Sequence, residues 1–246
     1  MTLDNQCKCH QSLKFSIRMA FQPIIDVQDK VIFSYEALVR GEEGQEANYV
    51  LSKVTNDNKY SFDQQCRITA IEAIAKLNRS ATVNINFLPN AIYEPETCLA
   101  RVLEVAKTVS FPHDQIIFEV TEHEKITNHS LLKNIFTTYR RMGFRTAIDD
   151  FGEGFAGLNL LADFQPDFLK LDMKLIQGIS QNSVKQAILS GIQITSEKLG
   201  IKLIAEGIET RDDYLFLMDN GIRYMQGYYF AKPALEMLPE IAEYIL

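Results

Sequence analysis

The sequence has few positive charges, few cysteines and no long apolar run, and each shortage excludes a class of protein. Lys and Arg number 25 against 32 Asp and Glu, which gives a net charge of −7, and no Lys/Arg cluster is present. This balance excludes the electrostatic footprint of a protein that binds duplex DNA. No apolar stretch approaches the roughly 20 residues needed to cross a bilayer, so we expect no membrane span.

The amino-terminal residues and the four cysteines indicate a cytoplasmic protein. Residues 1–18 are polar and lack the apolar centre of a secretion signal. Four cysteines in a chain without such a leader suggest reduced thiols. Cys7, Cys9 and His10 could ligate zinc, but their spacing is too tight for an ordinary ligand pair and no second pair completes the site. We therefore expect residues 1–15 to be a poorly ordered extension and residues 16–246 to form one domain.

Helix-like and strand-like patterns alternate along the chain. Apolar residues at helical spacing predict helices over residues 62–78, 97–109, 131–142 and 184–199. Gly143, Gly200 and Gly221 each follow a predicted helix, where glycine can adopt the left-handed turn that ends it. Residues 41–60 are polar and predict a loop with a short helix. Repeated strand–helix units imply parallel strands with right-handed crossovers, and this length favours a closed α/β barrel over an open sheet.

Seven strand-like runs end on residues that can bind a metal or a phosphate. The runs cover residues 31–36, 82–86, 116–119, 146–150, 168–172, 202–206 and 224–226. Their polar endings are Glu36, Asn86, Glu119, Asp149 with Asp150, Lys170 with Asp172, Glu206 and Gln226. Because the active site of an α/β barrel lies at the carboxyl ends of its strands, these side chains should share one rim.

The endings supply the ligands of a site for hard divalent cations. Mg²⁺ and Mn²⁺ prefer carboxylate and amide oxygens, and two such ions would bring the five carboxylates close to neutrality. A carboxylate shared by two metals supports in-line displacement at phosphorus, with Lys170 orienting the attacking water or offsetting phosphate charge. The alternatives are a helix-capping Asp149 with a solvated Asp150, and a surface Lys170. Adjacent strand residues point opposite ways, so both aspartates serve one site only if the strand ends there, as Gly152 and Gly154 would permit.

The segment Glu36-Ala37-Leu38-Val39-Arg40 resembles the signature of the EAL-domain family of cyclic di-GMP phosphodiesterases. The family's other motifs follow in order between residues 21 and 233. The segments of this chain that resemble them are Phe21-Gln22-Pro23-Ile24, Ile85-Asn86-Phe87-Leu88-Pro89, Phe118-Glu119-Val120-Thr121-Glu122, Asp149-Asp150-Phe151-Gly152-Glu153-Gly154, Leu169-Lys170-Leu171-Asp172, Ala205-Glu206-Gly207-Ile208-Glu209-Thr210 and Gln226-Gly227-Tyr228. The resemblance implies a single (β/α)8 TIM-like barrel with an irregular first strand. It also implies a cyclic-guanylate-specific phosphodiesterase that opens one phosphodiester of cyclic di-GMP and releases linear pGpG.

The resemblance also assigns roles to individual residues. The first metal would be held by Glu36, Asn86, Glu119 and Asp149, and the second by Asp149, Asp150 and Glu206. Glu206 would also hold the attacking water, or act as general base with Lys170. The remaining roles are substrate contact or pocket shape for Gln22, Arg40, Asp172 and Gln226, and anchoring of the loop around Gly152 for Glu122.

The cofactors and partners follow from the same resemblance. Two divalent cations, Mg²⁺ or Mn²⁺, are expected, and Ca²⁺ is expected to inhibit. Cyclic di-GMP is the expected ligand. A homodimer through helices next to the loop of the paired aspartates is also expected, and a sensor domain or protein is a possible regulator.

One loop departs from the pattern that active family members usually show. Glu153 stands where a small residue or threonine is common, and Ala156-Gly157 replaces two serines. The lost hydroxyls remove hydrogen bonds that could hold the loop. Two further hypotheses therefore stay open, a catalytically silent cyclic di-GMP receptor that signals through a protein partner, and a regulatory domain that binds no nucleotide.

Overall fold

The computed structural model describes residues 12–92, 94–121, 129–152 and 157–241. Its strands are β1 (Ile17–Asp26), β2 (Val31–Gly41), β3 (Val83–Asn86), β4 (Ile116–Thr121), β5 (Arg145–Phe151), β6 (Phe168–Leu171), β7 (Lys202–Ala205), β8 (Tyr224–Met225) and β9 (Ala234–Leu235). Its α-helices are α1 (Ala47–Leu51), α2 (Lys59–Leu77), α3 (Pro95–Thr108), α4 (His129–Arg141), α5 (Gly157–Asp163), α6 (Met173–Ile176), α7 (Ser183–Leu199) and α8 (Arg211–Asp219). Short 3₁₀ turns are η2 (Pro89–Ala91), η3 (His113–Gln115) and η4 (Ile179–Gln181).

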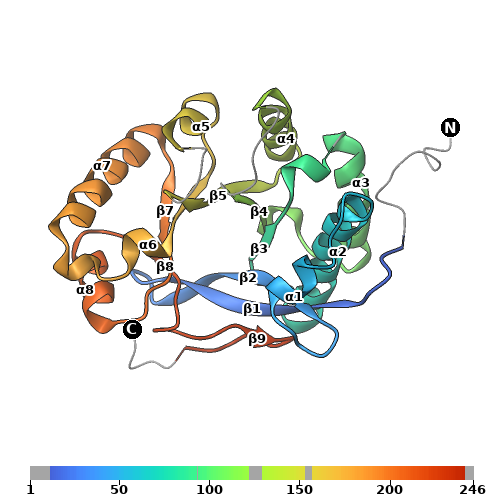
Figure 1. Cartoon of the computed structure of the whole chain (residues 1–246), viewed down its shortest axis with the longest axis horizontal. Coiled ribbons are helices and arrows are strands. Elements are labelled where there is room, and N and C mark those ends of the chain that lie inside the picture. The colour runs from blue at the N-terminus through green and yellow to red at the C-terminus, as the bar shows by residue number, and fades with distance from the viewer. Residues whose placement is uncertain (1–11, 93, 122–128, 153–156, 242–246) are drawn as a thin grey trace.

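Eight strands close into a barrel, which confirms the predicted TIM-like fold. The strands from β2 to β8 follow one another in chain order and are parallel to their neighbours. The ring closes through β1, which pairs with β2 on one side and with β8 on the other. Helices cover the ring on the left, top and right in Figure 1, where the strands lie at the centre.

β1, the first strand, which was expected to be irregular, differs from the other barrel strands in its direction. β1 runs antiparallel to both β2 and β8, and a short turn with no helix joins β1 to β2. β9 pairs with β1 at Ala20 and Phe21, where β8 does not reach, and lies with β1 at the bottom of Figure 1. An antiparallel hairpin needs only a tight turn, whereas a parallel pair needs a crossover, and this is why the link is short.

The four predicted helices are confirmed as α2, α3, α4 and α7, and the predicted short helix in residues 41–60 is α1. The three helix-ending glycines adopt positive φ as expected, with values of 86° for Gly143, 70° for Gly200 and 81° for Gly221. Phe15 packs against Phe62 of α2, with 6.4 Å between ring centroids. The expected disorder of residues 1–15 stays a prediction, because residues 1–11 lie outside the described part of the chain.

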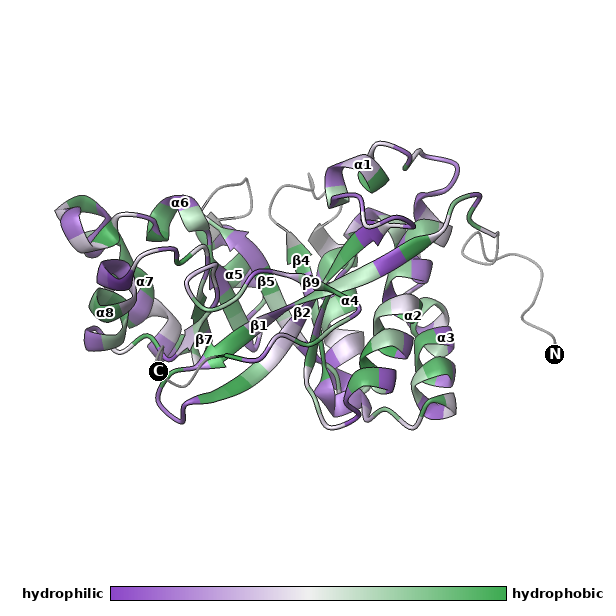
Figure 2. Cartoon of the chain, turned by 90° about the horizontal axis from the view of Figure 1, so that it is seen from below, coloured by the Kyte–Doolittle hydropathy of each residue, from purple (hydrophilic) through white to green (hydrophobic). Residues whose placement is uncertain are grey.

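The barrel interior has an apolar lower layer and a polar upper layer. Inward side chains alternate along each strand, so the residue two positions before each site residue belongs to the layer below it. Five such pairs recur, Ile117 with Glu119, Ala147 with Asp149, Phe168 with Lys170, Ile204 with Glu206, and Tyr224 with Gln226. The first members, with Ile24, form one buried apolar cluster. Apolar colour follows the strands through the centre of Figure 2, while the helices carry polar colour on their outer sides. This apolar cluster fills the barrel directly below the polar site residues.

Three strands continue beyond the polar residues that were expected to end them, which corrects that expectation. β2 continues to Gly41 beyond Glu36, β4 to Thr121 beyond Glu119, and β5 to Phe151 beyond Asp149. The strands persist because their outward-facing residues, such as Val120 and Phe151, pack in the outer core.

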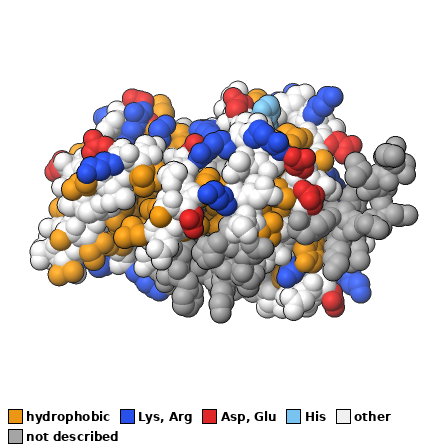
Figure 3. All heavy atoms as spheres, turned by 90° about the horizontal axis from the view of Figure 1, so that it is seen from above, with side chains coloured by type: hydrophobic (Ala, Val, Ile, Leu, Met, Phe, Trp, Pro, Cys, Tyr) orange, Lys and Arg blue, Asp and Glu red, His pale blue; other side chains and the backbone are white. Residues whose placement is uncertain are grey.

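The surface matches the charge pattern of the sequence. Basic and acidic side chains are interspersed on the face shown in Figure 3, which lies above the barrel as Figure 1 is drawn. Within the described ranges, none of the helices combines the length and the apolar character needed to cross a bilayer.

Candidate functional site

Lys170 lies at the centre of the polar layer and contacts four carboxylates. Its Nζ is 2.7 Å from Glu206 Oε1, 3.0 Å from Asp149 Oδ1, 3.1 Å from Glu119 Oε2 and 3.3 Å from Glu36 Oε2. The side chain is fully buried. The alternative of a surface lysine is therefore wrong, and strands β2, β4, β5, β6 and the end of β7 are brought together by one ammonium group.

Glu36 enters the site from β2 and accepts two amide hydrogen bonds. Asn86 Nδ2 donates to Glu36 Oε1 at 3.1 Å, and Gln226 Nε2 donates to Glu36 Oε2 at 2.7 Å. Gln226 Nε2 also reaches Gln22 Oε1 at 3.1 Å, and Gln22 is held in turn by Ala231 O. These contacts unite residues from both ends of the chain, as the convergence of strand ends predicted.

Glu119 is held by Asn84, a residue that the sequence reasoning missed. Asn84 Nδ2 donates to Glu119 Oε1 at 2.6 Å, while the other oxygen faces Lys170. Asn84 is fully buried two residues before Asn86, so both amides of β3 point into the barrel. The signal was present in the sequence, because Asn84 is a polar residue at an inward position where the next strand, β4, carries Ile117.

The two adjacent aspartates reach the site through an irregularity in β5. The register between β5 and β6 shifts between Ile148 and Phe151, and Asp150 has φ 54°, in the left-handed region. Asp149 Oδ1 accepts the backbone N–H of Asp150 at 3.0 Å. Such irregularities redirect side chains beside active sites. The expectation that the strand ends at the aspartates is thus corrected, because β5 continues to Phe151 and the change of direction occurs at Asp150 itself.

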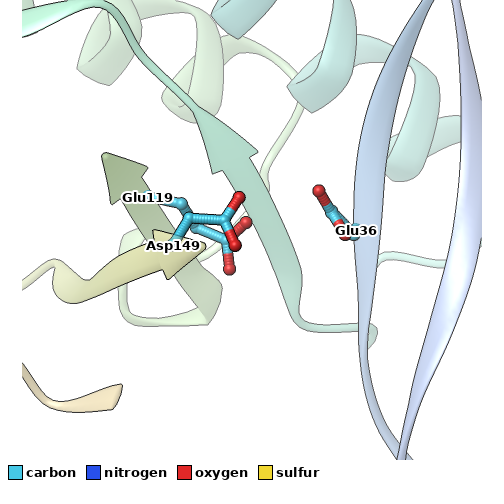
Figure 4. Close-up of side chains that lie close together, drawn as sticks. All are labelled: Glu36, Glu119 and Asp149. Carbon is cyan, nitrogen blue, oxygen red and sulfur yellow. The ribbon is translucent and has the colours of Figure 1, made fainter. Parts of the chain in front are cut away.

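The carboxylates form two overlapping groups that fit divalent cations. Glu36, Glu119 and Asp149 offer oxygens within 4.8 Å of one another, and so do Asp149, Asp150 and Glu206. Figure 4 shows Glu119 and Asp149 side by side, with Glu36 facing them from β2. Asp149 belongs to both groups, as expected for a bridging ligand. Oxygen donors of this kind suit Mg²⁺ and Mn²⁺, so the residues fit a site for divalent metal ions.

Burial and mutual repulsion disfavour the ionised form of the clustered carboxylates. Burial raises the pKa of Glu119 to about 8, with Glu36 and Asp149 adding to the rise against the opposing effect of Lys170. Burial and the charge of Asp149 also raise the pKa of Glu206. Burial alone would lower the pKa of Lys170, but the four carboxylates outweigh it and raise that pKa well above its usual value. Lys170 therefore stays protonated, and divalent cations would relieve the remaining repulsion.

Two cavities flank the acidic groups. One is mainly apolar and lies beside Leu38, Leu51, Phe62 and Asn86. The other is lined mostly by polar residues, including Gln22, Glu36, Asp172, Glu206, Gln226 and Tyr228. Asp150 lines both cavities. An elongated ligand could therefore place its centre over the carboxylates and one end in each cavity.

Two predicted substrate contacts have partners of their own. Asp172 caps α6 by accepting the N–H of Lys174 at 2.9 Å, and it also lines the polar cavity. The guanidinium of Arg40 lies 3.2 Å from Glu46 just before α1, and donates to Val39 O at 2.9 Å. Arg40 borders neither of these two cavities, so contact with a ligand there requires it to leave Glu46.

The predicted loop anchor Glu122 and the departing residues Glu153 and Ala156 lie outside the described residues. Their roles stay predictions.

A family model described as "EAL domain" matches residues 10–233. The chain is 30% identical over 235 residues to the blue light- and temperature-regulated antirepressor BluF of Escherichia coli K12. That match covers 95% of this chain and 58% of BluF, so the chain spans little more than half of that relative. It is 27% identical to the probable cyclic di-GMP phosphodiesterase PdeN of the same organism, covering 87% of this chain and 43% of PdeN.

Two solved structures resemble this one closely. A standalone versatile EAL protein from Vibrio cholerae O395, in a c-di-GMP bound form, superposes with a TM-score of 0.92 at 47% identity and covers 95% of this chain and 99% of that one. Klebsiella pneumoniae BlrP1, in a manganese/cy-diGMP complex, superposes with a TM-score of 0.87 at 33% identity and covers 94% and 59%. Because the family model matches most of the chain and the barrel superposes closely on that of a known EAL protein, the chain belongs to the EAL domain family.

Proposed function

We propose that the chain is a metal-dependent phosphodiesterase that hydrolyses one phosphodiester of cyclic di-GMP and releases linear pGpG. The observation that carries the proposal is the pair of acidic groups sharing Asp149, with Lys170 at their centre and a cavity on either side. The c-di-GMP bound Vibrio cholerae relative, at 47% identity, supports the choice of ligand. Cyclic di-GMP has two guanine bases on a phosphodiester ring, which agrees with a carboxylate centre between two cavities.

Each residue of the site has a distinct task in this proposal. Glu36, Asn86, Glu119 and Asp149 would hold one divalent ion, and Asp149, Asp150 and Glu206 a second. Bound Mg²⁺ or Mn²⁺ ions supply an acidified water and charge neutralisation at the phosphate.

Lys170 and Glu206 handle protons and charge. Lys170 stays protonated at neutral pH and would donate to the attacking water or to a phosphate oxygen. Glu206, whose carboxylate already contacts Lys170 Nζ at 2.7 Å, would accept the proton of that water. Gln22 and Gln226 would hold the substrate on the polar side. Arg40 would do so after it leaves Glu46.

A second candidate is a receptor that binds cyclic di-GMP without hydrolysing it. The relative BluF favours it, because the word antirepressor in its name describes a regulatory role. The intact acidic groups favour the enzyme, since binding alone does not need a second acidic group around Asp149.

Incubation with cyclic di-GMP and Mg²⁺ or Mn²⁺, followed by chromatography of the nucleotides, tests the proposal. We expect pGpG from the wild-type protein, none above background from Glu36→Ala, and inhibition by Ca²⁺. Asp26→Asn is the matched control, because Asp26 is a buried carboxylate that pairs with Arg223 at the opposite end of the barrel. Binding without pGpG formation would establish the receptor instead.

A further inference from the structure

A buried ion pair on α2 lies against the strand end that carries Asn86. Asp63 and Arg67 are one helical turn apart, and their exposed fractions are 2% and 1%. Asp63 Oδ2 accepts a hydrogen bond from Arg67 Nη2. Neither residue belongs to the two acidic groups of the site.

The second oxygen of Asp63 holds the backbone just beyond Asn86. Asp63 Oδ1 accepts the N–H of Leu88 at 2.8 Å. On the other side, the N–H of Phe87 donates to Glu119 O at 2.9 Å. The next residue, Pro89, has no N–H to donate. The backbone of residues 87–88 is therefore fixed between β4 and α2, immediately after the residue whose amide reaches Glu36.

Arg67 connects Asp63, and with it the backbone of residues 87–88, to α4. Its Nη1 donates to the Tyr139 hydroxyl at 3.3 Å, and its Nη2 to Gln64 Oε1 at 3.4 Å. The ring of Tyr139 packs against Phe87 with centroids 5.4 Å apart. The ion pair thus joins α2, α4 and the end of β3 through directional contacts.

Stability alone does not explain a charged pair at this place. Apolar residues of similar volume are often as stabilising as a buried ion pair, or more so, because desolvation offsets the attraction. An apolar pair, however, cannot accept the Leu88 N–H. What an oxygen acceptor at position 63 adds over an apolar side chain is a fixed position for that backbone.

We propose that Asp63 is a positioning residue for metal binding, because it fixes the backbone at Leu88 and thereby the direction in which Asn86 reaches Glu36. The inference rests on the proposed function only in that a divalent ion binds at Asn86 and Glu36. Groups that orient metal ligands typically change metal affinity by about 10- to 100-fold when they are removed.

Two sets of variants separate positioning from stability. The double variant Asp63→Leu with Arg67→Met replaces the pair by apolar groups. We expect the melting temperature to fall, because Leu88 N–H and the Tyr139 hydroxyl lose their partners, and Mn²⁺ affinity to become about 10- to 100-fold weaker. Asp63→Asn keeps an oxygen for Leu88 N–H but leaves Arg67 unpaired, so we expect a lower melting temperature with Mn²⁺ affinity close to wild type. Titration calorimetry and Mn²⁺ electron spin resonance, both without nucleotide, give the affinities.

Asp26→Asn provides the matched control at the other end of the barrel, and should lower the melting temperature without changing Mn²⁺ affinity. Wild-type affinity in the double variant would overturn the inference. So would affinities that follow the melting temperature across all variants, since that would indicate general destabilisation. Failure of pGpG formation with these Mn²⁺ results intact would remove the proposed catalysis and leave the inference standing. No Mn²⁺ binding by the wild-type protein would overturn both.

Discussion

At the scale of single residues, the site is a balance between one buried ammonium group and the carboxylates around it. Lys170 contacts four carboxylates, three from strands β2, β4 and β5 and one just after β7. A buried charge that lost these partners would be strongly destabilising, and so would the carboxylates without the lysine. Lys170 therefore keeps the metal-free barrel folded around an acidic centre.

Asn84 should matter for metal affinity although it is no expected ligand. Its amide fixes one oxygen of Glu119, which leaves the other directed at the centre of the site. We expect Asn84→Ala to weaken Mn²⁺ binding by about 10- to 100-fold, measured by calorimetry without nucleotide. Ser34→Ala is the matched control, since Ser34 is equally buried on β2 and its hydroxyl has no hydrogen-bond partner in the described part of the chain. Equal effects of both substitutions would contradict this role.

The sequence could predict those site residues whose neighbours follow from the order of the strands. Glu36, Glu119 and Lys170 were predictable, because parallel strands bring their carboxyl ends together whatever the details of packing. The link from Asp63 to Leu88 was not predictable, because it depends on how α2 rotates against the barrel. The pairing of Arg40 with Glu46 likewise depends on the path of a loop.

At the scale of elements, α8 is tied to the segment before α7 by one carboxylate. Asp213 on α8 accepts the N–H groups of Gly178 and Ser180, both at 3.0 Å, and the Thr210 hydroxyl at 2.9 Å. Burial would raise the pKa of Asp213, but these hydrogen bonds outweigh it and lower that pKa below its usual value.

The lowered pKa of Asp213 gives a pH dependence of stability with a definite sign. Because the folded state favours the ionised form, the stabilisation is present above the unfolded pKa of about 3.9 and is lost as the pH falls through the lower folded pKa. Asp213→Asn should lower the melting temperature at pH 7 and reduce its fall between pH 4 and pH 2. Thermal melts across that range check this. An unchanged acid limb in the variant would show that other carboxylates govern it.

At this scale, the sequence could not predict the direction of β1 or the register of β5, because hydrophobic patterns do not encode either property. The run 21–26 reads as a buried strand, but hydrophobic periodicity is the same for a parallel and an antiparallel strand, so the reversed β1 could not be predicted from it. The register shift in β5 was hidden for a similar reason, because the positive φ falls on an aspartate and not on a glycine.

At the scale of the whole molecule, α7 exposes apolar side chains that offer a dimer contact other than the one expected next to the loop of the paired aspartates. Val184 and Ile188, one helical turn apart, are 67% and 49% exposed. Burial of these two side chains against a second copy would be favourable. We expect Ile188→Glu to shift the protein toward monomer in analytical ultracentrifugation at several concentrations. Val31→Glu, at a similarly exposed apolar position outside α7, should leave the mass unchanged, and identical masses for all three proteins would contradict a dimer through α7.

The reversed β1 has a consequence for the order in which the molecule is made. β1 is synthesised first but pairs with β8 and β9, so the ring cannot close until the last strands exist. The contact between Gln22 and Gln226 spans 204 residues, a long-range closure of the kind that slows folding. The acidic residues from Glu36 to Glu206 are all made before the amide of Gln226 that completes Glu36. We therefore expect a nascent chain to gather its carboxylates in an open sheet, and to acquire a finished site only in the step that closes the barrel.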